Sequence, residues 1–166
     1  YETTLIELEE HFIDLLKGVR RKWIHEKVIR LASEMTIFQG DCRTILPALA
    51  GYDFDCIITS PPYSVTAQVG KVDELYTGTF AERKKQMYKY GSGGASANNI
   101  GRLNPFMFNQ AMLDVYKKCL GVLKPGGLYV SVTKDSMKEG VRQLLKMDII
   151  KQATQAGFEY TGDWWK

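Results

Sequence analysis

The residues best suited to do chemistry are Ser60, Pro61, Pro62 and Tyr63, which follow the apolar run 56–58. A short apolar run bounded by turn residues is typical of a buried strand. The two prolines remove backbone donors and hold φ near about −65°, so the ladder cannot continue and carbonyl acceptors are left. The sequence therefore predicts a rigid ledge of acceptors at the carboxyl end of a strand, where ligands bind in open α/β sheets. A plain Ser-Pro-Pro turn is the alternative interpretation.

With the tyrosine and the strand included, this stretch resembles the Ser/Asp/Asn-Pro-Pro-Tyr motif of amino-group DNA methyltransferases. These enzymes methylate the exocyclic nitrogen of cytosine or adenine with S-adenosylmethionine. The resemblance implies a catalytic set of Ser60, Pro61, Pro62 and Tyr63. In it, the Ser60 side chain and the Pro61 carbonyl accept hydrogen bonds from the target amino group, and Tyr63 stacks on a base flipped out of double-stranded DNA. Two such acceptors would favour a tetrahedral nitrogen whose lone pair can attack the sulfonium methyl group.

A second motif, Gly40-Asp41-Cys42, follows a strand predicted for residues 36–38. The resemblance implies that Asp41 lies near the adenine amino group of the cofactor, that the Cys42 backbone faces the adenine ring, and that Ser60 also contacts the cofactor. Asp41 is equally well explained as the N-cap of a helix predicted for residues 43–49.

A long irregular segment follows the ledge, at about residues 64–104. Its glycine- and serine-rich composition predicts a flexible loop, and long loops inside compact domains are usually functional or disordered. Basic residues are interleaved with aromatic ones, a combination that suits phosphates and stacked bases. We therefore expect contacts with DNA from Lys84, Lys85, Lys89 and Arg102. A solvated loop is the alternative.

Apolar periodicity predicts two segments. Residues 1–33 are expected to form an N-terminal helical pair, at 4–17 and 19–32. Residues 34–166 alternate strands and helices, which predicts mostly parallel strands flanked by helices. With the resemblance, this second segment is expected to be part of a Rossmann-like class I methyltransferase sheet. Its further predicted elements are a helix from Pro105 to Val122, a strand at 128–133, a helix at 147–156 and a last strand with Trp164 and Trp165.

Composition sets limits on partners and location. The chain has 166 residues, enough for one domain, and a net charge of +3, too small to establish a nucleic-acid partner by itself. No apolar run reaches the roughly 20 residues of a membrane span, so no membrane partner is expected. Three widely spaced cysteines favour free thiols in the cytoplasm, with the protein at the nucleoid when DNA is bound. His11 and His25 have no metal-ligand spacing, so no metal site is predicted.

Two features of the family were not found in the sequence: a glycine-rich turn after the first strand for the methionine part of the cofactor, and an acidic residue after the second strand for its ribose. We therefore expect that the missing half of the domain lies after Lys166 or, less favoured, before Tyr1, and that the 166-residue chain alone is inactive.

Several functions remain open. Because serine opens the motif, N4 of cytosine is the expected target, with N6 of adenine as the alternative. Restriction-modification is the expected setting, and a regulatory role remains the alternative. A non-catalytic nucleic-acid-binding subunit or degenerate methyltransferase is a second hypothesis, and methylation of RNA or protein amides is a third.

Overall fold

The structure is a computed structural model that describes residues 2–31, 34–62, 98–133, 136–138, 141–143 and 145–162. Strands and helices alternate along most of the chain. In chain order they are β1 (Thr3–Glu7), α1 (Glu10–His25), β2 (Met35–Gln39), α2 (Cys42–Ala48), β3 (Phe54–Thr59), η4 (Ile100–Arg102), α4 (Pro105–Val122), β4 (Leu123–Ser131), β5 (Ser136–Lys138), β6 (Val141–Gln143) and α5 (Leu145–Ala156).

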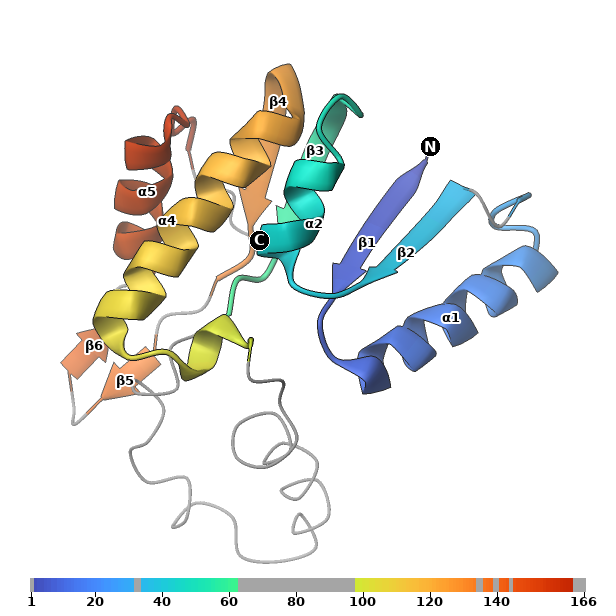
Figure 1. Ribbon diagram of the computed structural model, residues 1–166, viewed down its shortest axis with the longest axis horizontal. Helices are drawn as coiled ribbons and strands as arrows, with labels where there is room; N and C mark the ends of the chain where they lie inside the picture. Colours follow the sequence, from blue (N-terminus) through green and yellow to red (C-terminus); the bar gives the residue numbers. More distant parts are fainter. Residues whose placement is uncertain are drawn as a thin grey trace, which may run out of the picture.

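The described strands form three pairs rather than one sheet. β1 pairs with β2 and β3 with β4, both in parallel, whereas β5 and β6 form an antiparallel pair. Figure 1 shows the order β2, β1, β3, β4 across the molecule, with the four arrows pointing the same way. The expectation of mostly parallel strands flanked by helices is thus confirmed as an α/β arrangement of two-stranded parallel units.

The prediction of an N-terminal helical pair is wrong. The structure has strand β1 followed by a single helix, α1, which runs through Gly18 instead of ending there. The apolar stripe suggested a helix from residue 4, but Ile6 pairs with Phe38, which lies far along the chain. Local periodicity carries no information about such a non-local pairing, and the glycine is tolerated inside a helix at a cost of about 1 kcal/mol.

The helices and strands expected after residue 34 are confirmed where the structure describes them, except that the strand at 56–58 is not buried as predicted, since Cys56 and Ile58 are exposed. α4 begins and ends at the predicted residues: the Asn104 side chain accepts a hydrogen bond from the Met107 amide at 2.9 Å, and Pro105 occupies the first turn. Proline is favoured there because the first-turn amide has no helical partner. The last predicted strand, at Trp164 and Trp165, lies outside the described residues, as does most of the expected loop.

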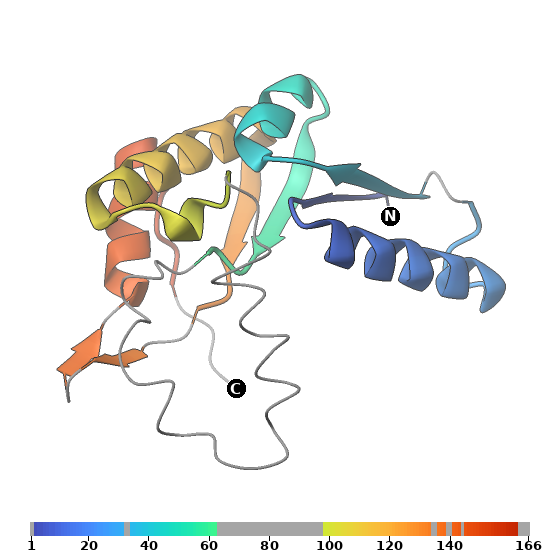
Figure 2. The ribbon, with the colours of Figure 1, turned by 60° about the horizontal axis from the view of Figure 1, so that its bottom comes forward.

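The core lies around α4. Among the described residues, its buried side chains come from α2 and its C-cap, from η4 and from α4, and they are Leu46, Leu49, Ile100, Ala111, Met112, Val115, Tyr116, Cys119 and Val122. Half-buried side chains of β3 and β4, among them Ile57 and Tyr129, pack against this cluster. In Figure 2, α2 lies on one side of the β1–β2 pair and α1 on the other. None of the helices in the described part of the chain is long and apolar enough to cross a membrane.

Candidate functional site

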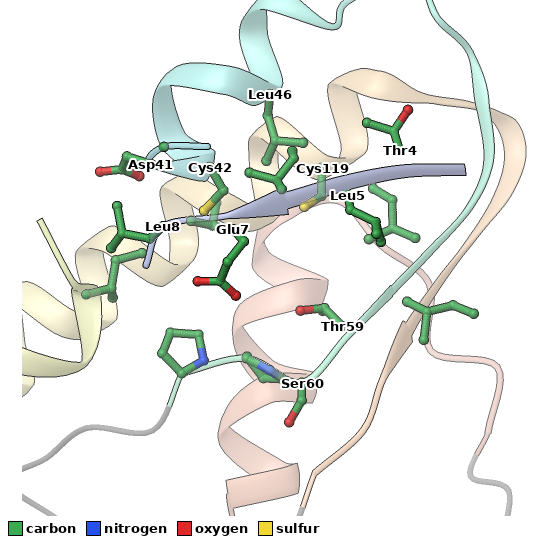
Figure 3. A pocket seen from close by; sticks show the side chains of 18 of the residues that line it. Thr4, Leu5, Glu7, Leu8, Asp41, Cys42, Leu46, Thr59, Ser60 and Cys119 are labelled. Atoms are coloured by element: carbon green, nitrogen blue, oxygen red, sulfur yellow. The ribbon is translucent and has the colours of Figure 1, made fainter. Parts of the chain in front are cut away.

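A cleft of about 810 Å³ lies between β1 and β3. Ser60, Pro61 and Pro62 line it together with Asp41 and Cys42 (Figure 3). The four strands run in the same direction, so the segments that follow β1, β2 and β3 meet at one edge. Two groups of residues that the sequence analysis assigned separately, to the target base and to the cofactor, are therefore brought together.

The acceptor ledge begins where β3 ends. The Thr59 carbonyl accepts a hydrogen bond from the Val132 amide at 2.8 Å, and Val132 directly follows Ser131, the last paired residue of β4. Pro61 is buried, while Ser60 and Pro62 are exposed. The buried proline fixes the backbone and leaves the serine accessible to a ligand. Tyr63 lies outside the described residues, so its stacking role stays a prediction.

Asp41 is the N-cap of α2, as one of its two interpretations predicted. Its side chain accepts hydrogen bonds from the Arg43 amide at 2.8 Å, from Arg43 Nε at 3.0 Å and from Arg43 Nη2 at 2.5 Å. The hydrogen bonds from the Arg43 side chain hold the pKa of this carboxyl below its usual value. The carboxylate is thus ionised and held in place at the cleft, with Arg43 occupying much of its accepting capacity. Contact with a cofactor stays a prediction.

Cys42 forms the first residue of α2 and is half-buried beside the cleft. Burial raises the pKa of its thiol. Burial also raises the pKa of the Cys119 thiol, which lines the same cleft, to about 12. At neutral pH both groups are uncharged thiols, so this wall of the cleft behaves as a weakly polar surface that suits contact with an aromatic ring.

The structure adds an acidic residue that the sequence analysis missed. Glu7 is the last residue of β1, and its side chain extends into the cleft between Asp41 and Ser60 (Figure 3). Its carboxylate accepts a hydrogen bond from the Glu9 amide at 2.9 Å. The sequence analysis did not consider Glu7 as an acidic residue at a strand end, because residues 4–17 were predicted to be a helix. Its contact with a ribose stays a prediction. The run Thr3-Thr4-Leu5-Ile6 before Glu7, rich in β-branched residues, was the available signal.

The charge of the cleft is one-sided. Its described lining contains Glu7, Glu9 and Asp41 and no lysine or arginine. Acidic groups that converge in a cleft with apolar walls attract cations and hydrogen-bond donors and repel phosphates. A nucleic-acid backbone would therefore have to approach the ledge from outside the cleft.

The residues expected to contact DNA are not tested by the structure. Lys84, Lys85 and Lys89 lie outside the described residues, and only the backbone of Arg102 is described, at the end of η4. Within the described part of the chain, no three histidine, cysteine or acidic side chains gather as metal ligands.

Comparison of the chain with protein-family models, with curated proteins and with solved structures found no match.

Proposed function

We propose that the chain is part of an S-adenosylmethionine-dependent DNA methyltransferase that acts on an exocyclic amino group, with N4 of cytosine as the target. The observation that carries the proposal is the shared edge: the acceptor ledge after β3 and the acidic cleft after β1 and β2 open onto each other. This is the relation that a methyl donor and a methyl acceptor require, because reacting atoms must approach to about 3–3.5 Å. On this proposal the strands belong to a Rossmann-like methyltransferase sheet.

The described residues fit the adenosine end of this cofactor. Glu7 can accept hydrogen bonds from ribose hydroxyls, and Asp41 retains lone pairs beside those used by Arg43 for an adenine amino group. The uncharged thiol of Cys42 supplies a surface for the ring. The acidic lining also matches the positive charge of a sulfonium. When bound, S-adenosylmethionine supplies the methyl group. Among the described lining residues no lysine or arginine is available to the methionine carboxylate.

The ledge then acts on the acceptor base. The Ser60 side chain and the Pro61 carbonyl accept hydrogen bonds from the two amino hydrogens and orient the nitrogen lone pair. Because Pro61 is buried, its carbonyl position is fixed before the base arrives. This preorganisation costs no rearrangement during the reaction.

The test is methyl transfer by the complete enzyme with the Ser60 side chain changed. Ser60→Ala removes one acceptor and should lower turnover by roughly ten- to a thousandfold. Ser60→Asn keeps an acceptor and should retain more activity than the alanine variant. Labelled methyl groups transferred to DNA, RNA and protein are counted in parallel, and the modified base is mapped in genomic DNA.

Each outcome has a meaning. Undiminished turnover in Ser60→Ala would remove Ser60 from the mechanism. If the methyl groups were found on adenine, the target would be adenine N6 and not cytosine N4. Methyl groups on RNA or protein alone would contradict the proposal that DNA is the substrate. A complete protein that binds DNA but transfers no methyl group would favour the non-catalytic subunit.

A further inference from the structure

The short segment before α4 reaches both acidic sides of the cleft. Asn98 and Asn99 line the cleft, and the next residue, Ile100, is 7% exposed and belongs to the core cluster. The Arg43 guanidinium donates a hydrogen bond to the Asn98 carbonyl at 3.3 Å. The Asn99 side-chain amide donates to the Glu9 carboxylate, also at 3.3 Å. A segment that is anchored in the core is thus tied to α2 on one side and to the start of α1 on the other.

These hydrogen bonds continue to the two carboxylates that the proposed function assigns to the cofactor. Arg43 holds Asp41 through its backbone amide and its guanidinium. On the other side of the cleft, the Glu9 amide donates to the Glu7 carboxylate at 2.9 Å. Two asparagines that are neighbours in sequence therefore connect, through one contact on each side, the carboxylates that Figure 3 shows in the same cleft.

The Asn99 side chain makes two different contacts at once. Its oxygen accepts a hydrogen bond from the Gly101 amide at 2.9 Å and so caps η4, while its nitrogen donates to Glu9. Glu9 is the N-cap residue of α1, but in the described part of the chain its side chain makes no capping hydrogen bond to that helix. An amide supplies an acceptor and a donor together, whereas a carboxylate supplies acceptors only. The residue type thus fits a link between η4 and the β1–α1 turn.

We propose that Asn99 is a positioning residue for the adenosine end of the cofactor. It holds Glu9, and with it the turn that carries Glu7, at a fixed separation from Asp41. The inference rests on the proposed function, in which Glu7 binds the ribose and Asp41 the adenine amino group. A ligand that is bound at both ends by groups of different elements binds most tightly when their separation is already set, because ordering a loose site on binding costs free energy.

The first readout needs no ligand and uses the 166-residue chain. Asn99→Ser keeps an acceptor that can cap η4, changes no charge and is too short to reach Glu9. Backbone amide exchange at Glu9, measured by NMR, should become about three- to tenfold faster, because the turn is released and its hydrogen bond to Glu7 is less persistent. Asn104→Ser is the matched control. Asn104 caps α4, so the same substitution changes a helix cap but should leave exchange at Glu9 unchanged.

The second readout is the dissociation constant of S-adenosylmethionine for the complete enzyme, measured by calorimetry. Asn99→Ser should raise it by about three- to tenfold, the effect of one net hydrogen bond, and Asn104→Ser should leave it unchanged. At saturating cofactor, turnover by Asn99→Ser should match that of the parent, because Asn99 acts on binding and not on the reacting atoms. Ser60→Ala should show the opposite behaviour, with lower turnover at saturation.

A reversed hydrogen bond separates positioning from a general structural role. Asn99→Asp keeps the cap of η4 but places two carboxylates together, so it should weaken cofactor binding at least as much as Asn99→Ser. Glu9→Gln alone keeps an acceptor for Asn99. The double variant Asn99→Asp with Glu9→Gln has the net charge of the parent and can form the same contact with donor and acceptor exchanged. Its affinity should recover to within about threefold of the parent.

Several results would overturn this role of Asn99. Unchanged exchange at Glu9 in Asn99→Ser would show that the contact does not hold the turn. An equal loss of affinity in Asn104→Ser would reduce the effect to general stability, and a double variant no better than Asn99→Asp would exclude the pairing with Glu9. These three results leave the proposed function intact. A complete parent protein that does not bind S-adenosylmethionine would contradict the proposed function and, with it, the role of Asn99 in cofactor binding.

Discussion

The two parallel strand pairs share a strand-helix-strand plan, but their packing differs greatly. Among the buried hydrophobic residues that the structure describes, Ile13 and Met35 belong to the β1–β2 unit with α1, whereas the other nine form the cluster around α4. On α1, Leu15 is 53% exposed and Trp23 is 39% exposed. The first unit has the same backbone architecture but little core of its own.

This difference shows that strand pairing and core packing contribute separately to the stability of the fold. Hydrophobic burial is the dominant favourable term in folding, so the unit with the larger buried cluster should set the global stability. The unit with fewer buried contacts should open at lower free energy, as regions with few buried apolar contacts do. Glu7 lies in this less stable unit. We therefore expect the β1 side of the cleft to open at a lower free energy than the β3 side.

The largest expected effect is in the firm unit. Tyr116 is 1% exposed and its ring meets that of Tyr129 edge to face, with centroids 5.7 Å apart. Tyr116→Ala should lower the free energy of unfolding by about 3–5 kcal/mol, the range for truncating a buried aromatic side chain. Urea unfolding measures this change. Phe106→Ala on the same helix, at a residue that is 70% exposed, should change it by less than about 0.5 kcal/mol.

Ile13→Ala provides the matching test in the weaker unit. Ile13 is 2% exposed, so its truncation should cost about 2 kcal/mol, the lower end of the range for such changes. Amide exchange should show the loss confined to α1, β1 and β2. A global loss as large as that of Tyr116→Ala would show that the two units are equally well packed and would break the comparison.

The same contrast explains what could be predicted from sequence. In the α4 unit each element is encoded locally: Asn104 and Pro105 start the helix, and the apolar run before Ser60 stands alone between turns. Local signals sufficed there. In the first unit, Leu5 fits a helical stripe with Phe12 on α1, yet it lies in a strand that pairs with Ile37. Only the later strand decides its state.

The residues of the candidate site were predicted where the strands before them were predicted. Ser60, Pro61 and Asp41 follow locally encoded strands and were identified from their motifs, whereas Glu7 was missed with its strand. The acidic character of the cleft was equally hidden, because it depends on which strand ends meet in space.

A smaller effect is expected at Gly40, where the two units are joined. Gly40 has a φ of +147° and its amide donates to the Glu7 carbonyl at 2.8 Å. A Cβ there would lie 3.2 Å from Ile45 Cδ1. Gly40→Ala should therefore cost about 1–3 kcal/mol and loosen the hydrogen bond to β1. Gly51→Ala, with a φ of +90° but nothing near its Cβ, is the control for backbone strain alone.

The readout is the free energy of unfolding together with exchange of the Gly40 amide. If Gly40→Ala and Gly51→Ala lower the free energy of unfolding equally, the contact with Ile45 is relieved by a small shift and adds nothing to the cost of backbone strain. A Gly40→Ala variant as stable as the parent would contradict the view that this turn holds the end of β1 against β2.

A pH-dependent effect of about 0.3–1 kcal/mol is expected for Asp41, because its carboxylate charge lies at the N-terminus of α2. Hydrogen bonds from Arg43 lower its pKa in the folded state below 3.8, its ordinary value. Its contribution is therefore complete above pH 3.8 and is lost as the pH falls through the folded-state pKa. Asp41→Asn should be less stable than the parent at neutral pH, and the difference should shrink in acid.

Urea unfolding between neutral and acid pH measures this dependence. Arg43→Gln removes the main cause of the lowered pKa and should reproduce part of the loss. Because the two residues form one pair, the double variant should be no less stable than Asp41→Asn alone. A difference between Asp41→Asn and the parent that stays constant with pH would show that the carboxylate charge does not stabilise the helix.

The smallest effect is expected at the ion pair between Asp55 and Lys124, which joins the starts of β3 and β4. The Asp55 side chain is 81% exposed and that of Lys124 is 48% exposed, so water and salt screen the pair. The hydrogen bond from Lys124 lowers the pKa of Asp55, so in Lys124→Gln this pKa should rise, as an NMR titration would show. The free energy of unfolding at neutral pH should fall only slightly, by linkage to this pKa change, and the loss should shrink at high salt. The ladder register shifts between Phe54 and Cys56, beside this pair. If Lys124→Gln unfolded the strands, the β3–β4 unit would depend on a surface contact, and the contrast with the β1–β2 unit would no longer be one of core packing.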